Sequence, residues 1–116
     1  MYAPADKEDL EFLKKALNAD FGGPMHHRAH LRLGWLLLRL EGESRALLVF
    51  KSIVVEYAEK LGIPNPYDFD KTTAWLGKIA RCIVEDDLKG APAYSFEEFM
   101  VRFGDRLKSE REKVKP

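Results

Sequence analysis

Three histidines that lie close together in the chain are the residues best suited to chemistry: His26, His27 and His30. His27 and His30 are three positions apart, and His26 and His30 are four apart. These are the spacings at which side chains on one helix face converge on a common ligand. An imidazole can ligate a metal, hydrogen-bond a small molecule or transfer a proton. The competing interpretation is structural: one or two of the rings cap the start of their helix or bond across to another helix, and the remaining one is exposed at the helix terminus.

The pattern around these histidines predicts which way they point. On a helix of 3.6 residues per turn, they share one side, and the arginines fall on the other: Arg28, Arg32 and Arg39. We therefore expect an arginine face in solvent and a histidine face towards the core. A buried polar group without a partner costs about 1 to 3 kcal/mol. Histidines on the core side must therefore be hydrogen-bonded or bind a ligand.

A second polar group follows later in the chain, at Tyr67, Asp68 and Asp70, with Thr72 close behind. Thr72 shares a helix face with apolar residues, so it is expected to point into the core at the start of its helix. The ordinary interpretation is that Asp70 caps this helix, Tyr67 packs on the loop and Thr72 bonds its own backbone. The alternative is that these polar atoms meet the histidines.

The elements that must position these groups are helices, because apolar residues recur every three to four positions between turn signals. The predicted helices span about Lys7–Asn18, His26–Leu40, Ser44–Leu61, Asp70–Lys89 and Ser95–Phe103. Ser44 and Asp70 are expected as N-caps, and Ser95 with Glu98 has the spacing of a capping box. The predicted fold class is all-α, an antiparallel helical bundle of four main helices plus a short C-terminal helix. Residues 1–104 are expected to form one domain and 105–116 a polar C-terminal tail.

The predicted core follows from the same periodicity. The first helix is expected to pack with Leu10, Phe12, Leu13 and Leu17. Trp75 falls at the centre of the apolar face of its helix, whereas Trp35 lies near the arginine face. We therefore expect Trp75 to be the more securely buried tryptophan. Cys82 lies on an apolar stripe and is expected to be an inert core residue.

Composition excludes several classes of protein. The 116 residues are 46% hydrophobic and 33% charged, which is typical of a soluble globular domain. The formal net charge is zero, so we expect no nucleic-acid partner, since such proteins usually carry a basic excess. The apolar runs fall well short of the roughly 20 residues of a membrane span, so no membrane partner is expected. The single cysteine and the lack of a signal sequence favour a cytoplasmic protein.

The order of an antiparallel bundle predicts where the two polar groups lie. In such a bundle the second and fourth helices are parallel, so their N-terminal ends share one end of the domain. His27 and His30 are therefore expected to meet Asp68 or Tyr67 in one pocket, with Thr72 alongside. A carboxylate close to an imidazole would raise its pKa.

Two segments also resemble a family of small, largely uncharacterised all-helical bacterial proteins. The family pattern reads F-x-H-x-x-H-x-R-x-A-W and then Y-H-x-T-x-T. The matching positions are Met25 for the Phe, His27, His30, Arg32, Gly34 for the Ala, and Trp35. In the second motif Tyr67 and Thr72 match, while Asp68 stands for the His and Asp70 for the first Thr. The resemblance covers roughly residues 10 to 85 and carries no known activity.

This resemblance implies that the two motifs face each other across a shared pocket. His27, His30 and Asp68 would then form a metal set of two histidines and one carboxylate. That combination is compatible with the divalent metals Zn or Fe. A carboxylate at this position has a shorter reach than the family's imidazole, which changes the geometry of the site.

Two functions from different classes follow. The first is a pocket for a small-molecule ligand or a divalent metal, with an enzyme as one form of it, built from His26, His27, His30, Tyr67, Asp68 and Thr72. No motif names a reaction, so binding is favoured over catalysis. The second is a protein-protein interaction module acting as a homodimer. Its basis is two apolar residues, Leu48 and Val55, that point away from the main apolar face of their helix.

Overall fold

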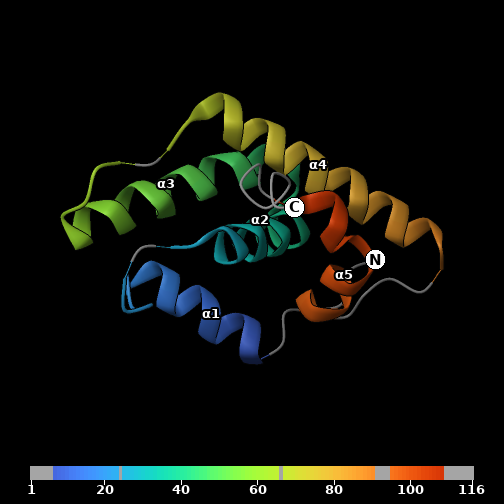
Figure 1. Ribbon diagram of the computed structural model, residues 1–116, viewed down its shortest axis with the longest axis horizontal. Helices are drawn as coiled ribbons and strands as arrows, with labels where there is room; N and C mark the ends of the chain where they lie inside the picture. The colour runs from blue at the N-terminus through green and yellow to red at the C-terminus, as the bar shows by residue number, and fades with distance from the viewer. Residues whose placement is uncertain (1–6, 24, 66, 91–94, 109–116) are drawn as a thin grey trace, which may run out of the picture.

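The computed structural model describes residues 7–23, 25–65, 67–90 and 95–108. Within these ranges the chain forms five α-helices, a terminal 3-10 turn and no strand (Figure 1). The elements are α1 (Lys7–Leu17), α2 (His27–Glu41), α3 (Glu43–Leu61), α4 (Phe69–Leu88), α5 (Phe96–Phe103) and the 3-10 helix η1 (Gly104–Leu107). The predicted all-helical class, with a short helix after the main ones, is confirmed.

Short-range chemistry explains most of the helix ends. Gly62 ends α3 in the left-handed conformation (φ +69°), where a side chain would be strained. The Ser95 hydroxyl accepts a hydrogen bond from the Glu98 amide at 3.2 Å, as the predicted cap requires. Two predicted caps are wrong. The helix α3 begins at Glu43, so Ser44 lies inside it, and Asp68 rather than Asp70 caps α4.

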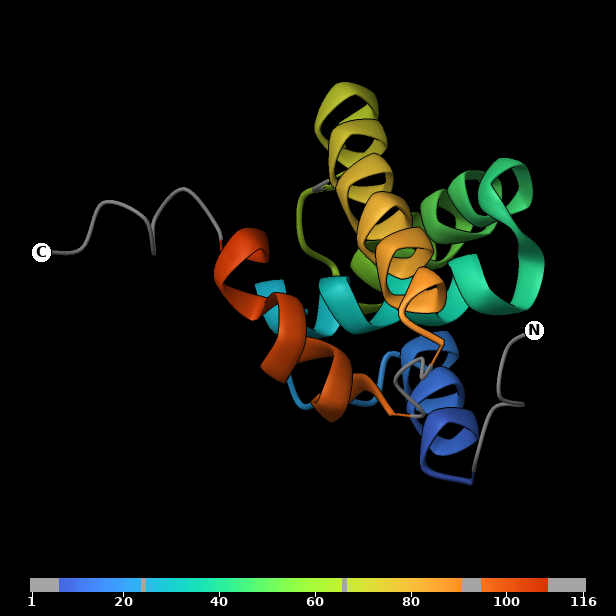
Figure 2. The ribbon, with the colours of Figure 1, turned by 90° about the vertical axis from the view of Figure 1, so that its right-hand side faces the viewer.

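The helix α2 lies in the middle of the molecule and crosses α4 (Figure 2). It contacts α3, α4 and α5. Most of its residues are buried, and Leu33 and Trp35 are 0% and 1% exposed. A helix covered on several sides has little room for a solvent face.

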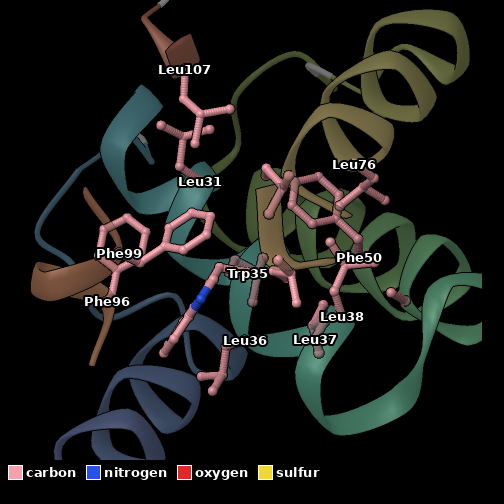
Figure 3. Close-up of a cluster of buried hydrophobic side chains, with 14 of the residues drawn as sticks. Leu31, Trp35, Leu36, Leu37, Leu38, Phe50, Leu76, Phe96, Phe99 and Leu107 are labelled. Carbon is pink, nitrogen blue, oxygen red and sulfur yellow. The ribbon is translucent and has the colours of Figure 1, made fainter. Parts of the chain in front are cut away.

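The predicted arginine face of α2 holds for Arg28, which is exposed, and is wrong for Arg32 and Arg39. Arg39 is only 6% exposed, with its guanidinium 5.0 Å from the centroid of the Trp35 ring. Arg32 pairs with the buried Asp9 at 3.2 Å. The cause is α5, which supplies Phe96 and Phe99 to the Trp35 ring at centroid distances of 5.7 and 6.0 Å (Figure 3). Trp35 is thus fully buried, whereas Trp75 is only partly buried.

The first helix packs with only part of the predicted face, since Phe12 and Leu13 contact the core but Leu10 and Leu17 do not. Its buried residues are Asp9, Phe12 and Ala16, while Leu10 and Leu17 are 57% and 49% exposed. The ion pair of Asp9 with Arg32 lies on the buried side. Apolar periodicity alone could not detect a buried carboxylate.

The core extends past the predicted domain end at residue 104. Leu107, in η1, is 1% exposed and lies beside Leu31 (Figure 3). Arg106 forms an ion pair with Glu85 of α4. The segment up to Leu107 is therefore part of the packed structure, and residues 109–116 of the predicted tail lie outside the described residues.

Within the described ranges, none of the helices combines the length and the apolar character needed to cross a membrane. The longest, α4, has 20 residues and carries charged side chains along its length.

Candidate functional site

A pocket of about 170 Å³ lies where the N-terminal ends of α2 and α4 meet against α3. Its apolar lining consists of Leu31, Phe50, Val54, Trp75, Leu76 and Ile79. Its polar lining consists of His27, His30, Tyr67, Asp68, Lys71 and Thr72. The structure thus brings together the histidine segment and the Tyr67–Thr72 segment, far apart in the sequence.

Local hydrogen bonds fix the polar rim. The Asp68 carboxylate accepts from the Lys71 amide at 2.9 Å, which caps α4. The Asn65 side-chain oxygen accepts from the Tyr67 amide at 2.9 Å, which folds the loop back before the helix begins. Tyr67 and Thr72 are therefore held on two sides of the same helix start.

His27 has a structural partner. Its Nε2 lies 2.9 Å from the carbonyl oxygen of Leu107, and because a carbonyl only accepts, this nitrogen carries the proton. Its ring packs edge-on against Trp75, with centroids 4.9 Å apart. His27 therefore joins three elements at the pocket wall: α2, α4 and η1.

His30 differs, because no hydrogen bond to its ring is formed within the described ranges of the chain. The ring is partly buried, 6.2 Å from the Phe50 ring between centroids. Burial is the main cause that lowers the pKa of His30 to about 4, and the neighbouring His27 and His26 contribute to the same shift. His30 is therefore neutral at pH 7, with one nitrogen donating and one accepting. The rise expected from a neighbouring carboxylate is not found.

Gly34 of α2 lies against two residues of the pocket lining, Leu76 and Ile79. A Cβ atom at Gly34 would lie 3.0 Å from Leu76 Cδ2 and 3.1 Å from Ile79 Cδ1. At these distances the Leu76 and Ile79 side chains would have to move to make room for the Cβ atom. The lack of a side chain at Gly34 therefore allows α2 and α4 to approach closely at this depth.

The predicted metal set is not assembled. Among the residues that the structure describes, no group of three or more His, Cys, Asp or Glu side chains could hold a metal ion. The reason is local, since Nε2 of His27 bonds to Leu107 and the Asp68 carboxylate turns back to cap α4. His26, predicted to bind ligand, is exposed just before the first turn of α2 and does not line the pocket.

Several lining residues were not predicted as site residues. Trp75, Leu76 and Ile79 share the Thr72 face of α4, so their helical spacing could have indicated them. Phe50 and Val54 come from α3, which no motif linked to the histidines. Apart from its charge, nothing in the sequence indicated that Lys71 would line the pocket.

Opposite charges lie around the rim. Lys71 and Asp68 both line the pocket and both are exposed. Two further amines lie against its aromatic walls: Lys51 Nζ is 5.5 Å from the centroid of the Tyr67 ring and Lys78 Nζ is 4.7 Å from that of Trp75. These distances suit cation-π contact, which orients the two rings.

Other reactive groups lie away from the pocket. Cys82 is buried, and burial raises the pKa of its thiol, so it is protonated and unreactive at neutral pH. Asp86 is 2% exposed and pairs with Arg102 of α5 at 2.5 Å. This pair joins α4 to α5 and has a structural role.

No family model matches the chain, and no curated protein or solved structure is similar to it. The motif resemblance therefore stays a prediction. The function is inferred from the residues of the pocket.

Proposed function

We propose that this protein binds a small organic molecule, about the size of a single ring, in the pocket between α2, α3 and α4. The observation that carries this proposal is His30, a partly buried imidazole in the wall of an apolar pocket, whose ring has no hydrogen-bond partner among the described residues. Polar groups left unpaired in such surroundings are costly unless a ligand or water pairs with them. Concave apolar sites with a few convergent polar groups are the usual form of small-molecule sites.

The size of the pocket sets the size of the ligand. Its volume of about 170 Å³ is close to that of cavities, on the order of 150 Å³, that accept benzene. Phe50 and Trp75 provide aromatic walls, and Leu76 and Ile79 provide an aliphatic floor. A single aromatic or aliphatic ring fits these dimensions.

Binding is favoured over catalysis. An imidazole with a pKa of about 4 is a weak base at pH 7, and general bases work best with a pKa near the operating pH. Among the described residues that line the pocket, none is a cysteine or a serine. The binding of a divalent metal by His27 and His30 is not part of the proposal, since His27 is engaged by Leu107.

The proposal includes an up-and-down order of α2, α3 and α4, which brings the N-terminal ends of α2 and α4 to one side. It also places the protein in the cytoplasm, where a free thiol such as that of Cys82 is common. The homodimer is the less favoured function. Leu48 is 68% exposed, but Val55 is partly buried, so the two do not form an open apolar stripe.

Toluene is the simplest probe of the pocket. We expect it to shift the NMR signals of the Trp75 indole N–H and the His30 ring, and to leave those of the fully buried Trp35 unchanged. Thr72→Phe should fill the pocket from its rim and abolish the shifts. Thr73→Phe is the matched control, because Thr73 is exposed and lies outside this lining. Toluene shifts that persist in Thr72→Phe, or that never occur, would refute the proposal.

A further inference from the structure

The geometry points to a neutral, hydroxylated ring as the ligand class, of which phenol is the simplest member, with its hydroxyl hydrogen-bonded to His30. This inference rests on the proposed function and adds the chemistry of the ligand. Three features of the pocket support this inference. They are the apolar lining, the presence of both signs of charge at the rim, and the uncharged polar groups of His30 and Thr72.

The apolar lining argues against a charged ligand. A charge that leaves water needs a paired opposite charge, because its desolvation is otherwise very costly. Phe50, Leu76 and Ile79 are buried and carry no charge. The lining residues with permanent charge are Lys71 and Asp68, and both remain in contact with solvent.

The rim carries both signs of charge, with one ammonium group and one carboxylate in the lining. A carboxylate ligand attracted by Lys71 would meet Asp68, whose Oδ1 lies 2.9 Å from the Lys71 amide. An ammonium ligand attracted by Asp68 would meet Lys71, with Lys51 and Lys78 beyond it on the Tyr67 and Trp75 rings. Either charged ligand therefore encounters repulsion as well as attraction.

Two uncharged polar groups of the lining, His30 and Thr72, suit a ligand with a hydroxyl. A neutral imidazole offers one donor and one acceptor, and the Thr72 hydroxyl can both donate and accept. A phenol hydroxyl can donate to one of these groups and accept from the other. The ring of such a ligand would lie among Phe50, Leu76 and Ile79.

Four probes of similar size distinguish the classes: toluene, phenol, benzoate and benzylamine. We expect phenol to bind about fivefold more tightly than toluene, the gain that one net hydrogen bond provides. Benzoate and benzylamine should bind at least tenfold more weakly than phenol. Affinities come from the Trp75 fluorescence of a Trp35→Phe variant and from NMR shifts of the wild-type protein.

His30→Leu tests the role of the imidazole, with His26→Leu as the control on an exposed histidine. In His30→Leu, phenol should lose its advantage over toluene, while toluene still binds and so reports a folded pocket. Tighter binding of benzoate or benzylamine than of phenol would overturn the ligand class and leave the pocket function intact. If phenol still binds more tightly than toluene to His30→Leu, the proposed ligand class is also overturned. Failure of all four probes to bind would overturn the proposed function itself.

Discussion

The imidazole of His27 packs edge-on against the indole of Trp75, 4.9 Å between centroids, while its Nε2 donates to the carbonyl of Leu107. One side chain therefore links the first turn of α2 to α4 and to the C-terminal 3-10 turn. The wall of the candidate pocket and the packing of Leu107 depend on the same ring.

His27→Phe tests this link, since it keeps an aromatic ring against Trp75 and removes the hydrogen bond. We expect a loss of about 1 kcal/mol in the free energy of unfolding, measured by urea denaturation. Amide exchange in residues 104–107 should accelerate more than exchange in α3. His26→Phe is the control, because His26 is exposed, and equal effects of the two variants would contradict the role assigned to His27.

Helix existence could be predicted from the sequence, because capping and periodicity act within a few residues. Ser95 with Glu98, and Gly62 at the end of α3, behave as local chemistry requires. The meeting of His27 and His30 with Tyr67, Asp68 and Thr72 around one pocket also agrees with the geometric expectation.

Burial around α2 could not be predicted in the same way. Periodicity shows which face of a helix is the most apolar. It does not show how many other helices pack against that helix. Trp35 lies near the arginines in sequence projection, yet α5 covers that side and encloses it. The cap of α4 was misjudged because two aspartates lie near the start of this helix, and a shift of two residues decides whether Asp68 or Asp70 caps it.

The reversed burial of the two tryptophans predicts different accessibility to solvent. In single-tryptophan variants, acrylamide should quench Trp75 fluorescence in Trp35→Phe more strongly than Trp35 fluorescence in Trp75→Phe. Trp35 is 1% exposed, whereas Trp75 lines the pocket. Stronger quenching of Trp35 would contradict the placement of α5 over α2.

The ion pair between the buried Asp86 and the more exposed Arg102 predicts a marked loss of stability when the Arg102 cation is removed. Arg102→Met leaves a carboxylate that is 2% exposed without this partner, and we expect unfolding free energy to fall by about 2 kcal/mol or more. Arg45→Met is the control, since the Arg45–Glu41 pair is mostly exposed and such pairs contribute less than about 1 kcal/mol. Similar losses in the two variants would show that burial of Asp86 carries no special cost.

Gly34 predicts a coupling between helix spacing and the pocket. Gly34→Ala gains about 1 kcal/mol in helix propensity, but its Cβ displaces Leu76 and Ile79, and overpacking costs about 1 to 3 kcal/mol. We expect a net loss of stability of about 1 kcal/mol and weaker binding of toluene. Gly77→Ala is the control in α4, where the nearest contact of a Cβ is the flexible end of Arg81 at 3.7 Å. If both variants bind toluene with the same affinity, a side chain at position 34 does not affect the pocket.

His30 predicts how stability depends on pH. Burial lowers its pKa in the folded state to about 4, below the 6.5 of an ordinary histidine. Above pH 6.5 the His30 ring is neutral in both the folded and the unfolded state, so its titration does not change the stability of the protein. As the pH falls from 6.5 towards 4, the unfolded chain takes up a proton that the folded protein does not, so stability is lost over this window.

The expected loss from His30 is about 3 kcal/mol at most, because each pKa unit corresponds to about 1.4 kcal/mol. Urea denaturation at steps between pH 7 and pH 4 measures it. His30→Leu removes this titration, so its unfolding free energy should fall less steeply over the same window than that of the wild type. His26→Leu serves as the control, because exposed His26 faces solvent rather than the pocket. If the wild type and His30→Leu show the same slope, His30 is not held neutral by the fold, and its place in the pocket wall has to be revised.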